Sequence, residues 1–140
     1  MAAGEYEVAL RAYTRAASEQ GLNVDVLSAL GSANLKLGRL NQAKKLLRRA
    51  VAKDDRFVPA WNNLGVVLSN QGNLQEARRV FQLAYALDRG NSEQIRTNLT
   101  KIIAKIKKTS YTAQNNNNNN FELVRRGNGR YLLLKTASSS

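Results

Sequence analysis

The sequence contains no cysteine and no histidine, and it has a single proline among 140 residues. Without cysteine the chain can form no disulfide, no thiolate metal site and no cysteine nucleophile. Without histidine it lacks the side chain that most often acts as a general base or a metal ligand. These absences predict a protein that is not an enzyme and that uses no metal and no cofactor.

Long apolar runs are missing as well. No run approaches the roughly 20 residues that a membrane-spanning helix needs. No charged start followed by an apolar stretch and a small-residue cleavage site is visible either. Apolar residues still make up 43% of the chain, which is enough for the core of one domain of ordinary size.

Acidic side chains are scarce in the last third of the chain. Residues 1–93 hold 13 basic and nine acidic side chains, whereas residues 94–140 hold nine basic side chains and one acidic side chain, Glu122. The formal net charge of the whole chain is +12. A basic C-terminal third is typical of proteins that contact nucleic acid, lipid headgroups or an acidic protein, and a solvated basic surface explains it equally well.

What the sequence does contain is a repeat. When it is shifted by 34 residues, similar side chains align along much of its length. The aligned pairs are Leu27 with Trp61, Leu30 with Leu64, Gly31 with Gly65, Gly38 with Gly72, Leu40 with Leu74, Ala43 with Ala77, Leu47 with Phe81, and Ala50 with Ala84. So many matches at one offset predict a repeat architecture.

Each unit has the pattern of two helices. Apolar residues recur at helical spacing over residues 24–37 and again over 42–53, with Gly38 between them, and residues 58–91 copy this pattern. Gly31 and Gly65 fall inside helices, where glycine costs about 1 kcal/mol relative to alanine. We therefore expect a neighbouring helix to cross close to each of these two glycines.

The residues themselves point to a family. The run Trp61-x-x-Leu64-Gly65, followed by Leu68, Gly72, Ala77, Phe81 and Ala84, resembles the tetratricopeptide repeat (TPR). The likeness is close in residues 58–91, good in 24–57, and extends over about residues 4–91. It implies an all-α fold, a TPR-type α-α superhelix in which helix hairpins form a right-handed solenoid. It implies little about function, because solenoid scaffolds serve many partners.

The TPR solenoid is expected to occupy residues 1–108, with full repeats at 24–57 and 58–91. Gly4 corresponds to the turn inside a unit, so residues 5–20 are predicted to be the second helix of a truncated repeat. We favour a cut into a longer protein over a partial repeat that caps this one. Residues 92–108 are predicted to form a capping helix that covers the last open face of the solenoid. Its apolar face comprises Ile95, Leu99, Ile102 and Ile106.

The remaining residues lack the solenoid pattern. Residues 109–120, which include six consecutive asparagines, are predicted to be a flexible polar linker. The pair Asn128-Gly129 is a strong turn signal and predicts a short β-hairpin over 121–136, with a disordered end at 137–140. The hairpin would dock on the solenoid, on a second copy of the chain or on a partner's sheet edge, through Phe121, Leu123, Leu132 and Leu134.

The resemblance also implies a binding site. In TPR arrays the first helices of successive units line a concave groove that holds an extended peptide or a partner helix. The residues that this places in the groove are Ser28, Ser32, Leu35, Lys36, Asn62, Asn63, Val66, Ser69, Asn70 and Arg96. Amides and hydroxyls can bond to a peptide backbone, and Lys36 and Arg96 would favour acidic groups. The carboxylate clamp of chaperone-binding TPR domains is not expected, since only Asn63 matches its pattern.

The leading hypothesis is a non-catalytic scaffold for protein–protein interaction. Residues 91–99 resemble the TPR lipoproteins that assist Flp/Tad pilus assembly, which suggests an assembly factor of a bacterial envelope or pilus secretion system. The alternative is binding of an anionic surface, nucleic acid or membrane, through the basic C-terminal third. A protein partner is favoured over nucleic acid, because no platform of stacked aromatic and basic residues is visible.

The sequence is compatible with two cellular compartments. A signal ahead of residue 1 would place the protein in the periplasm or envelope and could anchor it to a membrane, and otherwise it would be cytoplasmic. An oligomer could form through the hairpin.

Overall fold

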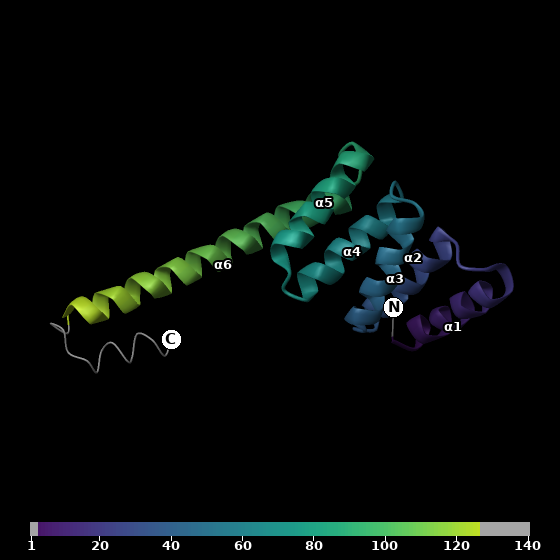
Figure 1. Cartoon of the computed structure of the whole chain (residues 1–140), viewed down its shortest axis with the longest axis horizontal. Coiled ribbons are helices and arrows are strands. Elements are labelled where there is room, and N and C mark those ends of the chain that lie inside the picture. Colours follow the sequence, from purple (N-terminus) through teal and green to yellow (C-terminus); the bar gives the residue numbers. More distant parts are fainter. Residues whose placement is uncertain (1–2, 127–140) are drawn as a thin grey trace. The chain divides into compact units, whose positions relative to one another are not determined.

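The computed structural model describes residues 3–126, and within them the side chains of residues 3–19 and 21–117. Every element in this range is an α-helix. In chain order the helices are α1 (Ala3–Gln20), α2 (Val24–Lys36), α3 (Leu40–Lys53), α4 (Val58–Asn70), α5 (Leu74–Asp88) and α6 (Glu93–Arg126). Short loops join α2 to α3 and α4 to α5, so that each pair forms a helix hairpin (Figure 1). The predicted all-α TPR-type fold is confirmed.

The chain divides into two compact units, Met1–Ile103 and Ala104–Ser140. The first unit contains α1 to α5 and the first part of α6. Within it α2 packs on α3 and α4 packs on α5, while α1 contacts α2, and α4 contacts both α3 and α2. This is the stacking of helix hairpins that the 34-residue period predicts.

The core of the first unit is built from the residues that the repeat aligns. Leu47 on α3 and Phe81 on α5 occupy the same repeat position, and both are buried. Leu30 and Leu64, on α2 and α4, form a second aligned pair and are buried as well. Trp61 is half-buried, and its indole Nε1 donates a hydrogen bond to the Asp55 carbonyl at 2.7 Å. That bond ties α4 to the loop before it and satisfies the polar atom of the ring.

Two glycines allow the helices of each hairpin to approach closely. A Cβ atom at Gly31 would lie 2.6 Å from Leu47 Cγ, and one at Gly65 would lie 2.5 Å from Phe81 Cε1. Both distances are far below van der Waals contact. The close crossing that the sequence predicts at these glycines is confirmed.

Helices α1, α2, α4 and α5 are each followed by a residue in the left-handed conformation, and after α5 this residue is not glycine. After α2, Gly38 has φ 76°, and its N–H donates to the Leu35 carbonyl. Gly72 takes the same conformation after α4, with φ 84°. After α5 the left-handed position that ends the helix is held by Arg89, with φ 57°. An L residue is strained in this conformation, whereas glycine is not.

Replacing Arg89 with glycine is therefore expected to stabilise the protein by about 0.5–1 kcal/mol. Urea denaturation followed by circular dichroism measures the difference. Gly38→Ala, which creates the opposite mismatch after α2, should destabilise by a similar amount. Equal stability of Arg89→Gly and the parent chain would contradict the argument.

Helix α6 begins close to residue 92, where the capping helix was predicted to begin, and continues further than predicted. The Ser92 hydroxyl accepts a hydrogen bond from the Ile95 N–H at 3.3 Å, as an N-cap does. Ile95 and Ile102 are buried, whereas Leu99 and Ile106 are half-buried. Instead of ending near Lys108, the helix runs on to Arg126.

The predicted linker and the first six residues of the predicted hairpin are wrong, because α6 runs through both. Residues 109–120 are helical rather than a flexible tether, and residues 121–126 are helical rather than a strand. Phe121 and Leu123 therefore lie on α6, whereas Leu132 and Leu134 lie outside the described residues, as does the end at 137–140. No glycine or proline interrupts residues 93–126, and an established helix gains one hydrogen bond for each residue that it adds. The low helix propensity of asparagine is by itself not enough to end such a helix.

None of the helices in the described part of the chain has the length and apolar character needed to cross a membrane.

Candidate functional site

Two matching stripes of side chains, one on α2 and one on α4, form the candidate site. Within each stripe the residues lie three or four positions apart, so they follow one face of the helix. A shift of 34 residues superposes one stripe on the other, with the same order of exposed and half-buried side chains. We call these eight residues the inner surface: Asp25, Ala29, Ser32 and Lys36 on α2, and Pro59, Asn63, Val66 and Asn70 on α4.

The inner surface contains half of the residues predicted to line the groove. Since α2 and α4 contact each other and the two stripes occupy equivalent repeat positions, we expect Ser32 and Lys36 to lie on the same side as Asn63, Val66 and Asn70. Lys36 and Asn70 are exposed, and the other three are half-buried. Together they offer one hydroxyl, two amides, one ammonium group and one branched apolar side chain. This set can hydrogen-bond to a peptide backbone and pack against one apolar side chain.

Three predicted groove residues are buried instead. Ser28, Leu35 and Asn62 have relative exposures of 5%, 8% and 6%. The Asn62 side chain accepts a hydrogen bond at Oδ1 from Asn98 Nδ2 of α6, at 2.9 Å. Asn62 therefore joins α4 to α6. Little of these three side chains is left for a ligand to contact.

Arg96 also has partners within the fold. Its Nη1 donates to the carbonyl oxygens of Gly90 and Asn91, the second at 3.1 Å. The guanidinium thus holds the loop between α5 and α6, which weakens the case for Arg96 as a ligand for acidic groups. Ser69, the last predicted groove residue, is half-buried.

The inner surface is close to electrically neutral. It carries one acidic side chain, Asp25, and one basic side chain, Lys36. The two ion pairs between described side chains, Arg39 with Glu7 at 2.6 Å and Arg48 with Glu76 at 2.8 Å, involve none of its residues. A ligand would thus be recognised here mainly by hydrogen bonds and shape.

Sequence reasoning did not include Ala29 and Pro59 in the groove. The signal was available, since Ala29 aligns with Asn63, and Pro59 with Asp25, at the repeat offset. Neither side chain carries a polar group, so a search for hydrogen-bonding residues passes over both.

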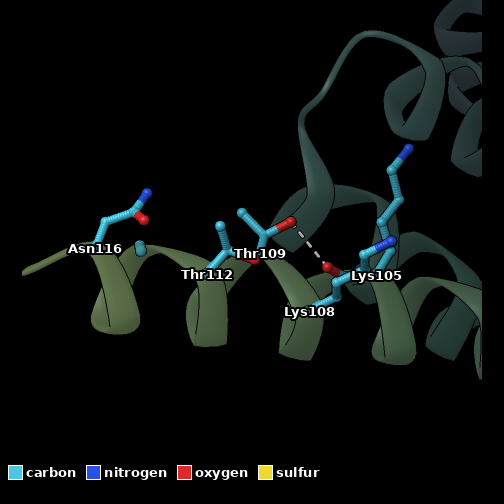
Figure 2. Close-up of a pocket in the computed structure, with 6 residues that line it drawn as sticks. Lys105, Lys108, Thr109, Thr112 and Asn116 are labelled. Carbon is cyan, nitrogen blue, oxygen red and sulfur yellow. Dashed lines mark hydrogen bonds between the residues drawn. The ribbon is translucent and has the colours of Figure 1, made fainter. Parts of the chain in front are cut away.

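A separate hollow of about 520 Å³ lies on α6, in the second unit. Figure 2 shows that its lining comes from one helix, and the Thr109 hydroxyl donates to the Lys105 carbonyl at 2.9 Å. The lining residues are Lys105, Lys108, Thr109, Thr112, Ala113 and Asn116. A single helix supplies only one wall, so these polar groups do not converge on a point as those of a ligand pocket do.

Among the described residues, no three aspartate or glutamate side chains are grouped so that they could hold a metal ion.

The family model of the tetratricopeptide repeat matches residues 1–43 and 28–92. A curated human relative, Tetratricopeptide repeat protein 7B, is 34% identical over 85 residues, which make up 61% of this chain and 10% of that protein. The chain thus corresponds to about a tenth of the length of this relative.

Solved structures show the same fold. The second TPR domain of human RPAP3, determined in complex with the HSP70 peptide SGPTIEEVD, is 31% identical. That match has a TM-score of 0.64 and covers 71% of this chain and 82% of the RPAP3 chain. The Sgt2 TPR domain from Aspergillus fumigatus is 23% identical, with a TM-score of 0.73, and the match covers 77% of this chain and 72% of that one.

Proposed function

Because the chain belongs to the tetratricopeptide repeat family, we propose that it is a non-catalytic interaction module that binds an extended peptide or a partner helix of another protein. The proposed site is the inner surface. The observation that carries the proposal is the match between its two stripes, which present accessible side chains at equivalent positions of two successive repeats. The similar RPAP3 domain, solved with a bound peptide, supports a peptide ligand.

The proposed chemistry follows from the side chains. The amides of Asn63 and Asn70 and the hydroxyl of Ser32 would bond to the peptide backbone, and Val66 would pack against an apolar side chain. Amide contacts to the backbone do not select particular side chains. Since Lys36 is the only cation on the inner surface, the ligand would not have to be acidic.

A selection experiment tests this proposal. Random 12-residue peptides displayed on phage are panned against the full chain, and the affinities of the selected peptides are measured by calorimetry. In the double variant Asn63→Ala/Asn70→Ala two hydrogen-bonding groups are lost, each worth about 0.5–1.5 kcal/mol. The affinity should therefore fall roughly tenfold or more.

The matched control removes two amide side chains from another place. Gln75 and Gln82 are exposed on α5, so Gln75→Ala/Gln82→Ala should bind the same peptides within about twofold of the parent chain. Circular dichroism shows whether each variant keeps its fold. If both double variants bind alike, the peptides contact another surface and the proposal fails.

A narrower role also has support in the sequence. The resemblance of residues 91–99 to TPR lipoproteins of Flp/Tad pilus assembly favours an assembly factor of a bacterial envelope or pilus secretion system. Deletion of the gene in its own host, followed by counting of surface pili, tests this role. Normal piliation would refute it.

A further inference from the structure

The second helices of the repeats carry an outward-facing set of basic and small residues. On α3, the buried residues Ala43, Leu47 and Ala50 mark the side that faces the core. Lys45, Arg49 and Ala52 lie away from that side at helical spacing, and all three are exposed. The repeat offset gives the same exposed positions on α1 and α5. We call the nine residues the outer grid: Arg11, Arg15, Ser18, Lys45, Arg49, Ala52, Arg79, Leu83 and Ala86.

Two ion pairs link the segments that carry the grid. Glu7 of α1 pairs with Arg39, the residue just before α3, at 2.6 Å. Arg48 of α3 pairs with Glu76 of α5 at 2.8 Å. These long side chains bridge α1 to the start of α3, and α3 to α5, although the backbones of α1 and α3, and those of α3 and α5, are not in contact. We call residues at equivalent repeat positions on the three helices a row of the grid.

The rows differ in chemistry. The first row is basic throughout, with Arg11, Lys45 and Arg79, and the second contains two further arginines and Leu83. The third row contains only small side chains, one serine and two alanines. The grid thus holds five cations and no acidic residue, and none of the five forms an ion pair with a described side chain. Five exposed cations without a carboxylate partner attract an anionic ligand.

A hollow opens beside the middle column of the grid. It has a volume of about 320 Å³ and is lined by Leu27, Arg49, Ala52 and Lys53. Ala52 is exposed and supplies apolar surface, the buried Leu27 lies beneath it, and the two cations flank it. Leu83, on the same row as Arg49, is another apolar contact, since 39% of it is exposed.

We propose that the outer grid is a second binding surface, which takes an acidic segment of a partner protein that also carries apolar side chains. The carboxylates would pair with the basic rows, and arginine favours such pairs because its guanidinium can hold a carboxylate with two hydrogen bonds. The apolar side chains would contact the hollow, Leu83 and the two alanines of the third row. The partner segment would lie across α1, α3 and α5, and this binding would not depend on the inner surface.

The hollow and the apolar grid residues favour a protein over other polyanions. A nucleic acid backbone would satisfy the cations but leave these apolar surfaces unused. A membrane would also attract the cations, but membrane-surface helices insert large apolar residues such as Trp, Phe and Leu. Leu83 is the only side chain of that kind in the grid.

The test uses the full chain and a fluorescein-labelled 12-residue peptide, EELEELEELEEL, in fluorescence anisotropy at about 0.15 M salt. The peptide repeats two glutamates and one leucine, so it offers the grid both carboxylates and apolar side chains. The parent chain should bind this peptide saturably. It should bind QQLQQLQQLQQL at least tenfold more weakly.

Charge reversal of the first row gives the decisive comparison. Arg11→Glu/Lys45→Glu/Arg79→Glu should weaken peptide binding at least tenfold. The control Lys101→Glu/Lys107→Glu/Lys108→Glu reverses three exposed cations on α6, with the same change in net charge, and should weaken binding less than threefold. If charge reversal disturbs the fold in circular dichroism, Arg11→Ala/Lys45→Ala/Arg79→Ala is used in its place, with Lys101→Ala/Lys107→Ala/Lys108→Ala as its control.

Three results would overturn the proposal. Equal loss in the two triple variants would mean that only the overall charge attracts the peptide. Tighter, grid-dependent binding to a 20-base-pair DNA duplex or to vesicles with anionic lipid would assign the surface to those ligands. The absence of saturable peptide binding would remove the acidic segment as a ligand. The first-row variant should still bind the peptides that were selected on the inner surface. Its binding to those peptides therefore tests the proposed function separately from the outer grid.

Discussion

Replacing Phe81 with alanine is expected to lower the free energy of unfolding by about 3–5 kcal/mol. Phe81 is 2% exposed and fills the space between α4 and α5 beside Gly65. Truncation removes buried apolar surface and leaves a cavity that the two helices can close only in part. Since a domain of this size is stable by about 5–15 kcal/mol, the variant should be largely unfolded at moderate urea concentrations. Urea denaturation followed by circular dichroism measures the loss.

Leu83→Ala is the matched control for this prediction. It lies on the same helix, two residues further along, but 39% of the residue is exposed. Its loss should cost about 1 kcal/mol or less. Similar destabilisation by the two truncations would show that α5 does not use the buried face described above.

Adding a single methyl group at Gly65 should also destabilise the protein, by about 1–3 kcal/mol. On helix propensity alone, Gly65→Ala would gain about 1 kcal/mol. The new Cβ would however lie 2.5 Å from Phe81 Cε1 and 2.7 Å from Cδ1, so either the ring or the helix must move. The steric term should outweigh propensity, and thermal unfolding of the variant measures the balance.

A double variant and a second glycine make this prediction specific. Phe81→Ala removes the ring that the new Cβ would meet, so Gly65→Ala/Phe81→Ala should lose clearly less stability than the sum of the two single variants. Gly4→Ala places the same methyl group on α1, where no atom lies within 4 Å of the new Cβ, and should not destabilise. Additive losses in the double variant would place the cause outside the Gly65–Phe81 contact.

The repeat made much of this fold predictable from sequence. Aligned small residues such as Gly31 and Gly65 predicted close helix crossings, and aligned large residues such as Leu47 and Phe81 predicted the core between them. Both patterns are local to one hairpin. Side-chain size at helical spacing is sufficient to encode them, because the two helices of a hairpin are joined by a short loop.

The candidate site was only partly predictable, because its accessibility depends on the neighbouring repeat. Asn62 and Asn63 are adjacent amides on α4, yet Asn62 bonds to Asn98 of α6, whereas Asn63 is half-buried on the inner surface. Arg96 was expected to face a ligand, but it binds loop carbonyls. Sequence spacing assigns a residue to a face of its own helix. It does not say how much of that face the next helix covers.

By itself, the sequence determined the helical period, the pairing of helices into hairpins and the residues that fill each hairpin, since these follow from side-chain size and polarity repeated every 34 residues. The tertiary structure decided which polar side chains stay accessible, among them the basic residues of the outer grid on α1, α3 and α5. It also carried α6 through the asparagines to Arg126, where composition predicted a linker. The physical reason is the same in each case: burial and helix propagation depend on what lies beside a residue as well as on the residue itself.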